Sequence, residues 1–365
     1  MTEPASAGPV ISVVIPVYGV AGLLGECLDS VLCQTGVGQS GPPIEVIAVE
    51  DHSPDASGAL LDERAARDPR LRVIHLESTG GPGHARDTGL AHASGDYVWF
   101  VDGDDTLAPG ALPAVARKLA GLHPDVLLLD HEQVFASGQT EPGPGGDLLR
   151  AAASAAPPTF TLADRPELIN LSMTCWSKVF RLAFLREVGV PFGNGIHEDV
   201  PVSATALLSA RRIGVLDQVC YRYRRGRRTS LTGRTSAANF DIFCSYQRIF
   251  NFITVRGKSI PPVSAAVHKA LFERAIWHYT VILATGGIGI GRLGVGGLVP
   301  RARRREFFDR MAADFTRLRP TGYQLPGGAR GAKLRLVERD AYGTYSLLEP
   351  VNQLRVALLR MVPGR

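Results

Sequence analysis

Short apolar runs alternate with segments of helical periodicity over the first 130 residues of the chain. The runs are rich in Val and Ile and nearly continuous, which is typical of strands covered on both faces of a sheet. We expect such strands at residues 10–18, 44–53, 70–78 and 96–102. Between them, apolar residues recur at helical spacing, and we expect helices at residues 21–34, 55–68 and 80–94. This alternation predicts an α/β fold with a mainly parallel sheet and helices on both faces.

Polar side chains follow the apolar runs at the points where the strands end. They are Tyr18 after the first run, Glu50 and Asp51 after the second, and Asp102 and Asp104 after the fourth. The carboxyl ends of parallel strands meet at one edge of a sheet, where the ligands of such folds bind. The sequence therefore predicts a single crevice that collects these groups.

The stretch "VWFVDGDDT" (98–106) places Asp102, Asp104 and Asp105 around one glycine at the end of an apolar strand. Carboxylates at a strand end suit a hard divalent cation such as Mg²⁺ or Mn²⁺, which completes its shell with substrate phosphates and water. A nucleotide diphosphate fits that description. The alternative is a solvated turn, because Asp-Gly is a strong turn dipeptide.

Two common nucleotide motifs are missing from this crevice. The turn "GGPGHAR" (80–86) does not match the dinucleotide fingerprint, because the sixth position of the pattern that starts at Gly81 is Arg86. The sequence also contains no GxxxxGK stretch of the kind that forms a P-loop. Neither a nicotinamide cofactor nor ATP hydrolysis is favoured.

Five motifs in this order resemble the family 2 glycosyltransferases of the GT-A fold, over roughly residues 9–230. They lie in the stretches "VISVVIPVYGVAGLLGECLDSVLCQT", "IEVIAVEDHSPDAS" and "GGPGHARDTGLAHASGDYVWFVDGDDTLAPGAL". The resemblance implies that Asp51 reads the nucleotide base, with Glu50 where Asp is commoner, and that Arg86 reaches the base or the diphosphate. It implies that Pro16 and Tyr18 line the base pocket, and that Asp102 and Asp104 hold the metal and the sugar nucleotide. Asp87 replaces the usual Asn of the family, which we expect to matter little.

The stretch "FGNGIHEDVPV" (192–202) is similar to the Glu-Asp motif of the same family, in which the aspartate is the general base. Glycosyl transfer to a hydroxyl also needs a carboxylate that accepts the proton as the hydroxyl attacks, whatever the family. We therefore expect Asp199 to be the base, with Glu198 the next candidate. The alternative is that the pair only caps a helix.

Two further stretches are similar to parts of the family site. In "YRYRRGRRTSLT" (221–232), five arginines occur within residues 222–228, and the resemblance implies that Arg225, Arg228 and Ser230 neutralise the leaving diphosphate. A solvated basic hairpin is the alternative. In "MTCWSKVFR" (173–181), Trp176 is a candidate to stack on a sugar and Lys178 to contact a phosphate, although a Trp among apolar residues often belongs to a core.

Beyond residue 235 the pattern becomes helical, and we expect a catalytic domain at 1–235 and a helical, basic C-terminal region at 236–365. Helices are predicted at 240–253, 265–285 and 301–318, with a Gly-rich break at 286–297. Residues 301–365 hold 14 Lys and Arg against 6 Asp and Glu, which favours contact with a polyanion or a membrane surface. The alternative is that these arginines pair with Glu306, Asp309 and Asp314. The region also resembles the segment that, in actinobacterial teichoic-acid-type proteins, joins the glycosyltransferase to a CDP-glycerol glycerophosphotransferase domain.

The composition of the chain indicates where the protein works rather than which reaction it catalyses. The start "MTEPASAGPV" lacks the features of a secretory signal, no apolar run reaches the roughly 18 residues of a membrane span, and the five cysteines form no CxxC pair. We expect a cytoplasmic protein, peripheral to the membrane at most, with no nucleic-acid partner. The predicted function is metal-dependent, inverting sugar transfer from a nucleotide diphosphate, with UDP expected, to a cell-wall glycopolymer or lipid-linked acceptor. A noncatalytic glycopolymer-binding module with the same fold is the alternative.

Overall fold

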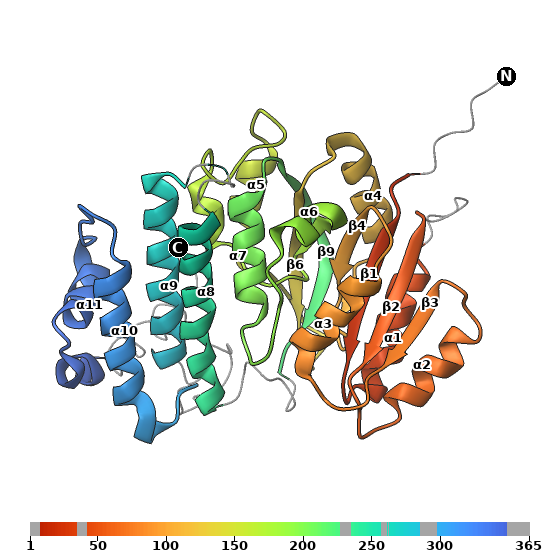
Figure 1. The fold of residues 1–365 in the computed structure, drawn as a ribbon, viewed down its shortest axis with the longest axis horizontal. Coiled ribbons are helices and arrows are strands. Elements are labelled where there is room, and N and C mark those ends of the chain that lie inside the picture. Colours follow the sequence, from red (N-terminus) through yellow and green to blue (C-terminus); the bar gives the residue numbers. More distant parts are fainter. Residues whose placement is uncertain are drawn as a thin grey trace. The chain divides into compact units, whose positions relative to one another are not determined.

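One mixed sheet runs through the first of two compact units, which comprises Met1–Thr229 and Ser245–Val263 (Figure 1). The computed structural model describes residues 8–34, 42–226, 235–256, 261, 263–284 and 298–348. Within those ranges, nine strands lie in the order β3-β2-β1-β4-β8-β6-β9-β5, and β7 pairs with β6. They are β1 (Ile11–Val17), β2 (Ile44–Glu50), β3 (Leu71–His75), β4 (Tyr97–Phe100), β5 (Thr106–Leu107), β6 (Val126–Val134), β7 (Thr140–Pro142), β8 (Lys178–Arg181) and β9 (Ile213–Arg224).

The four strands predicted from the apolar runs, β1 to β4, are parallel to one another, with β1 between β2 and β4. Strand β8 then runs antiparallel to both β4 and β6, and β9 returns parallel to β6. The prediction of a mainly parallel sheet with helices is confirmed. The half of the sheet that contains β8, β6 and β9 has both parallel and antiparallel pairs. Because β1, β2 and β4 end at the same edge, the polar residues that follow them share that edge.

Helices α1 to α7 follow the strands of this unit, together with a short 3-10 helix (Pro166–Asn170). They are α1 (Ala21–Leu32), α2 (Ser57–Ala65), α3 (Gly81–His92), α4 (Ala111–Leu122), α5 (Gly146–Ala153), α6 (Leu182–Val188) and α7 (Asp199–Ser209). The helix expected at 55–68 is shorter than predicted. It gives way to a turn in which the Asp68 carboxylate accepts a hydrogen bond from the backbone N–H of Arg70 (3.0 Å).

The two faces of strand β1 pack against different helices. Val13 belongs to the same hydrophobic core as Leu28 of α1, and α4 adds to that core. Val14, the next residue, lies against Gly89 of α3 instead. Since successive side chains of a strand point to opposite faces, α1 and α3 cover opposite faces of the sheet, as predicted.

The second unit, Ser230–Cys244 with Ser264–Arg365, is helical over its described residues. Its core is aromatic: the ring of Phe243 lies 4.6 Å from that of Phe307 and 4.5 Å from that of Tyr279, whose hydroxyl donates to Asp314 (2.9 Å). The predicted helices are present, whereas the Gly-rich break at 286–297 lies outside the described residues. The helices are α8 (Asp241–Arg256), α9 (Ala265–Ala284), α10 (Arg304–Leu318) and α11 (Gly328–Glu338), with short 3-10 helices at Ala237–Phe240 and Arg301–Arg303.

Helix α8 begins in the second unit, and its residues from Ser245 onward belong to the first. The division predicted at residue 235 stays a prediction. Among the helices of the described ranges, none is long and apolar enough to span a membrane.

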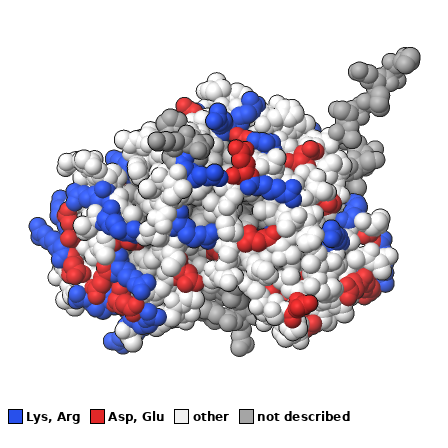
Figure 2. Space-filling view, in the orientation of Figure 1, with Lys and Arg blue, Asp and Glu red and all other residues white. Residues whose placement is uncertain are grey.

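Arginines of the basic C-terminal region pair with nearby carboxylates of the same unit. Arg303 lies 2.8 Å from Glu306, Arg305 lies 2.7 Å from Asp309, and Arg317 lies 2.6 Å from Asp314. Figure 2 shows basic and acidic side chains side by side over this part of the surface. These pairs are the ones named in the alternative to polyanion binding, so several arginines of this region already have carboxylate partners.

The close approach of α3 to β1 predicts a sharp cost for any side chain at Gly89. A Cβ there would overlap Cγ1 of Val14 in the packed core, so Gly89→Ala should lower the free energy of unfolding by about 1–3 kcal/mol. Gly25→Ala on α1 is the matched control, because its Cβ would meet no atom within 4 Å. That control should be neutral or stabilise by up to about 1 kcal/mol. Urea unfolding of both variants checks this, and equal stabilities would contradict the packing.

Candidate active site

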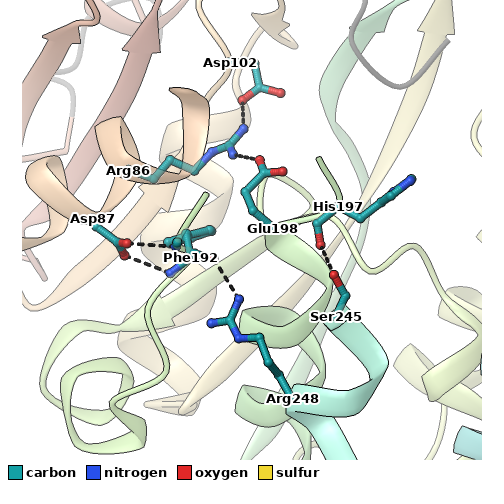
Figure 3. A network of polar contacts seen from close by, with 9 residues as sticks. Arg86, Asp87, Asp102, Phe192, His197, Glu198, Ser245 and Arg248 are labelled. Carbon is teal, nitrogen blue, oxygen red and sulfur yellow. Dashed lines mark hydrogen bonds and ion pairs between the residues drawn. The ribbon is translucent and has the colours of Figure 1, made fainter. Parts of the chain in front are cut away.

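A buried arginine joins the two predicted acidic motifs. Arg86 of α3 donates from Nη2 to Oδ1 of Asp102 (2.6 Å) and from Nη1 to Oε1 of Glu198 (Figure 3). Its guanidinium carbon lies 5.7 Å from the centre of the Phe192 ring. A charge that is removed from water must be balanced by opposite charges at close range. Arg86 therefore ties the end of β4 to the start of α7.

The loop at residues 191–193 is bound by side chains of α3 and α8 (Figure 3). The two carboxylate oxygens of Asp87 accept hydrogen bonds from the backbone N–H groups of Phe192 (2.9 Å) and Gly193 (3.0 Å). Arg248 of α8 donates to the carbonyls of Phe192 (2.9 Å) and Pro191. Asp87 thus uses both of its carboxylate oxygens to hold this loop, and the expectation that Asp in place of Asn matters little stays a prediction.

Backbone geometry just before the Glu-Asp motif is unusual. His197 is buried and has a φ of 65°, in the left-handed region that residues other than glycine rarely adopt. The hydroxyl of Ser245, on α8, donates to the His197 carbonyl (3.0 Å). Residues of α8 thus fix both the loop at 191–193 and the residue that precedes Glu198.

The three carboxylates of the "DGDD" stretch converge. One oxygen of each of Asp102, Asp104 and Asp105 lies within 4.8 Å of the others. The stretch is also a turn, because the N–H of Asp105 donates to the carbonyl of Asp102 (2.9 Å), so the two interpretations of this sequence are compatible. Oxygen ligands at this spacing fit a hard cation such as Mg²⁺ or Mn²⁺.

Asp105 differs from the other two carboxylates, because it is 1% exposed and already engaged. It accepts hydrogen bonds from the Tyr221 hydroxyl (2.8 Å) and from the Arg224 N–H (2.7 Å). Burial, and then the charge of Asp102, raise the pKa of Asp105 to about 8. Asp102 and Asp104 are only partly buried, so they are the accessible members of the cluster.

The residues expected to line the base pocket lie at the ends of β1 and β2. Asp51 is buried, and its carboxylate accepts from the N–H groups of Gly80 (2.6 Å) and Gly81 (2.8 Å). Glu50 is buried as well and accepts from the N–H of Ser53 (2.6 Å). Tyr18, by contrast, is half exposed, and Pro16 is partly buried. Their predicted contacts with a base stay predictions.

Asp199 is the first residue of α7 and faces the same charged cluster. Burial, and then the charge of Glu198, raise the pKa of Asp199 to about 7. Glu198 is the N-cap residue of the helix but makes no capping hydrogen bond, since its carboxylate pairs with Arg86. The alternative in which this pair merely caps a helix is therefore not supported.

The aromatic and basic candidates on the neighbouring segment are buried. Trp176 is 5% exposed and stacks on the ring of Tyr221, with centroids 4.5 Å apart. The ammonium of Lys178 donates to the carbonyls of Ser172 (2.6 Å) and Thr174 (2.9 Å) and is enclosed. The phosphate contact predicted for Lys178 does not fit this position. Both side chains hold the loop at 172–177 instead.

Of the three residues predicted to neutralise the leaving diphosphate, only Arg225 lies in the described part of the chain. Its guanidinium carbon lies 5.8 Å from the centre of the Tyr223 ring, and its N–H donates to the Val134 carbonyl (2.8 Å). Arg228 and Ser230 lie outside the described residues. Sequence reasoning missed the pairing of Arg86 with Glu198 and the contact of Tyr221 with Asp105. Only the pairing of Arg86 could have been anticipated from the sequence, because an arginine on the packed face of a helix requires a charged partner.

The bridge through Arg86 predicts a large stability effect. Arg86→Met should lower the free energy of unfolding by about 3–5 kcal/mol, because two carboxylates then lose their partner inside the protein. Glu198→Gln in the same chain should restore part of that loss. Arg67→Met is the control, since Arg67 pairs with Glu63 on the surface and should cost less than about 1 kcal/mol. Chemical unfolding measures all three, and an Arg86→Met loss as small as the control would contradict the bridge.

Comparison with known proteins shows which family part of the chain is similar to. Residues 12–186 match the model of glycosyl transferase family 2. An uncharacterized glycosyltransferase, EpsJ of Bacillus subtilis, is 29% identical over 218 residues, which are 59% of this chain and 61% of that protein. The poly(ribitol-phosphate) beta-N-acetylglucosaminyltransferase TarS of Staphylococcus aureus is 30% identical over 58% of this chain and 35% of its own length. The chain thus spans less than two thirds of the length of either relative.

Solved structures extend the likeness in fold. The crystal structure of S. aureus TarS 1-349 in complex with UDP-GlcNAc has a TM-score of 0.69 and 21% identity, and the match covers 94% of this chain and 91% of that one. At this identity the match shows a shared fold. Together with the family model over residues 12–186 and the strand-end carboxylates, it makes the chain similar to glycosyl transferase family 2.

Proposed function

We propose that the chain transfers a sugar, with inversion, from a nucleotide diphosphate donor to a hydroxyl of a glycopolymer or a lipid-linked acceptor. The observation that carries this proposal is the convergence of three carboxylates at a strand end, joined through Arg86 to the motif that contains Asp199. UDP is the expected nucleotide, since TarS was crystallised with UDP-GlcNAc. A teichoic-acid-type acceptor is supported by the poly(ribitol-phosphate) transferases and a minor teichoic acid biosynthesis protein among the relatives.

Asp102 and Asp104 are the residues that would hold a divalent ion, Mg²⁺ or Mn²⁺. Such an ion supplies positive charge that stabilises the departing diphosphate. Asp102 shares its carboxylate with Arg86, which fixes its orientation. We therefore assign Arg86 to positioning Asp102 and Glu198, rather than to contact with the base.

Asp199 is proposed to accept the proton of the attacking hydroxyl. Glu198 is committed to Arg86, so Asp199 is the carboxylate of the motif that remains available. A general base works best when its pKa lies near the working pH, and the raised pKa of Asp199, about 7, meets that condition. The oxygen of the acceptor then attacks the anomeric carbon as the bond to the diphosphate breaks on the opposite face.

Nucleotide contacts complete the proposal. The ends of β1 and β2 carry Pro16, Tyr18, Glu50 and Asp51. The end of β1 lies next to the metal loop, because a Cβ on Gly103 would approach the Pro16 carbonyl to 3.0 Å. We propose that these residues form the base pocket. Arg225, Arg228 and Ser230 are proposed to neutralise the diphosphate.

Metal binding is tested with Asp104→Ala. The variant should lose the gain in UDP affinity that Mn²⁺ brings, because an accessible carboxylate of the cluster is removed, while the fold stays intact. Glu63→Ala, an exposed carboxylate on α2, is the control and should retain that gain. Isothermal titration calorimetry with and without Mn²⁺ measures it. Unchanged Mn²⁺-dependent UDP affinity in Asp104→Ala would overturn the assignment.

Transfer itself is tested with the unaltered chain and with Asp199→Asn. The unaltered chain should release UDP from UDP-GlcNAc or UDP-glucose in the presence of poly(ribitol phosphate) and Mn²⁺, and EDTA should stop the release. Asp199→Asn should bind the donor normally and lose transfer by a factor of about 10² or more. Near-normal transfer in the variant would move the base elsewhere. No turnover of any nucleotide sugar by the unaltered chain would favour a noncatalytic binding module.

A further inference from the structure

The hydroxyl of Tyr221, on β9, makes two hydrogen bonds to the metal loop. It accepts one from the backbone N–H of Asp102 (3.1 Å) and donates one to Oδ2 of Asp105 (2.8 Å). A phenol has one proton to donate, and its oxygen can accept as well. The hydroxyl therefore satisfies a donor and an acceptor on either side of Gly103 and Asp104 at the same time.

Asp105 is bound to β9 through both oxygens of its carboxylate. Its other oxygen, Oδ1, accepts from the N–H of Arg224 (2.7 Å), three residues along β9 from Tyr221. The carboxylate of Asp105 is thus bound to one strand at two points. Asp105 is 1% exposed, in contrast to the partly buried Asp102 and Asp104. This engagement favours a role in shaping the loop over a role as a direct metal ligand.

The ring of Tyr221 is fixed as firmly as its hydroxyl. Tyr221 is fully buried and stacks on Trp176 at 4.5 Å with an interplanar angle of 14°. The Trp176 carbonyl in turn accepts a hydrogen bond from the indole N–H of Trp99 on β4 (2.8 Å). Strand β4 leads directly into Asp102. The ring and the hydroxyl of Tyr221 are therefore both linked to the end of this strand.

We propose that Tyr221 is a positioning residue that sets the spacing of Asp102 and Asp104 for the metal-bound nucleotide. The inference rests on the proposed function, because it concerns the same metal site. Without the hydroxyl, the Asp102 N–H and one oxygen of Asp105 would lose their partners inside the protein, which is costly. The loop would then relax to recover those contacts, and the carboxylates would no longer converge.

The test compares Tyr221→Phe with Tyr97→Phe. Tyr97 is a buried tyrosine of the same sheet, at the opposite end of β4 from the metal loop, and controls for the general effect of removing a buried hydroxyl. UDP affinity is measured by calorimetry in EDTA and in Mn²⁺. Tyr221→Phe should keep its UDP affinity in EDTA and lose about tenfold or more in Mn²⁺, which is the scale of a buried hydrogen bond. Tyr97→Phe should match the unaltered chain in both.

Asp105→Asn and the double variant complete the experiment. If the hydroxyl and the carboxylate act as one unit, the double variant should lose no more Mn²⁺-dependent affinity than the worse single variant. A purely structural role for Tyr221 would lower UDP affinity equally with and without metal, and that result would overturn the inference. So would a Tyr221→Phe variant with the full Mn²⁺ gain. If the unaltered chain itself shows no Mn²⁺ gain, the proposed function fails first.

Discussion

The need to balance one buried guanidinium organises the site. Arg86 lies inside the protein, where an uncompensated charge is prohibitively costly, and only carboxylates at close range remove that cost. One comes from the end of β4 and the other from the start of α7, 112 residues further along the chain than Arg86. A strand end that would hold a metal and a helix that would carry the base are therefore fixed at one mutual distance by the same side chain.

Segments outside the family match complete this arrangement. The matched residues end at 186, whereas Glu198 and Asp199 follow it and Ser245 and Arg248 lie on α8. These two residues of α8 hold the carbonyls of the loop that leads to the Glu-Asp motif. The helical stretch beyond residue 235 therefore serves in part as a support for the site, and several of its arginines pair with neighbouring carboxylates.

Local pattern predicted much of the fold. The parallel strands β1 to β4 and their helices followed from apolar runs and helical spacing, and the strand-end residues followed from the rule that such ends share an edge. Strand β5 has only two residues, which is too few to form a periodic pattern in the sequence. The contact of Tyr221 with Asp105 spans 116 residues, and no local signal encodes a hydrogen bond between side chains so far apart. Lys178 is a candidate for a phosphate contact in the sequence, because the sequence does not show that its side chain is buried.

The central claim is that Asp102 and Asp104 hold a divalent ion that binds the donor diphosphate. Crystals grown with Mn²⁺ and UDP, measured at a wavelength where manganese scatters anomalously, test it most directly. The account predicts one strong anomalous peak that contacts the diphosphate and a carboxylate oxygen of each of Asp102 and Asp104, with Oδ1 of Asp102 still bonded to Arg86. A well-ordered UDP in this crevice with no manganese peak at the carboxylates, or a peak bound elsewhere, would contradict it.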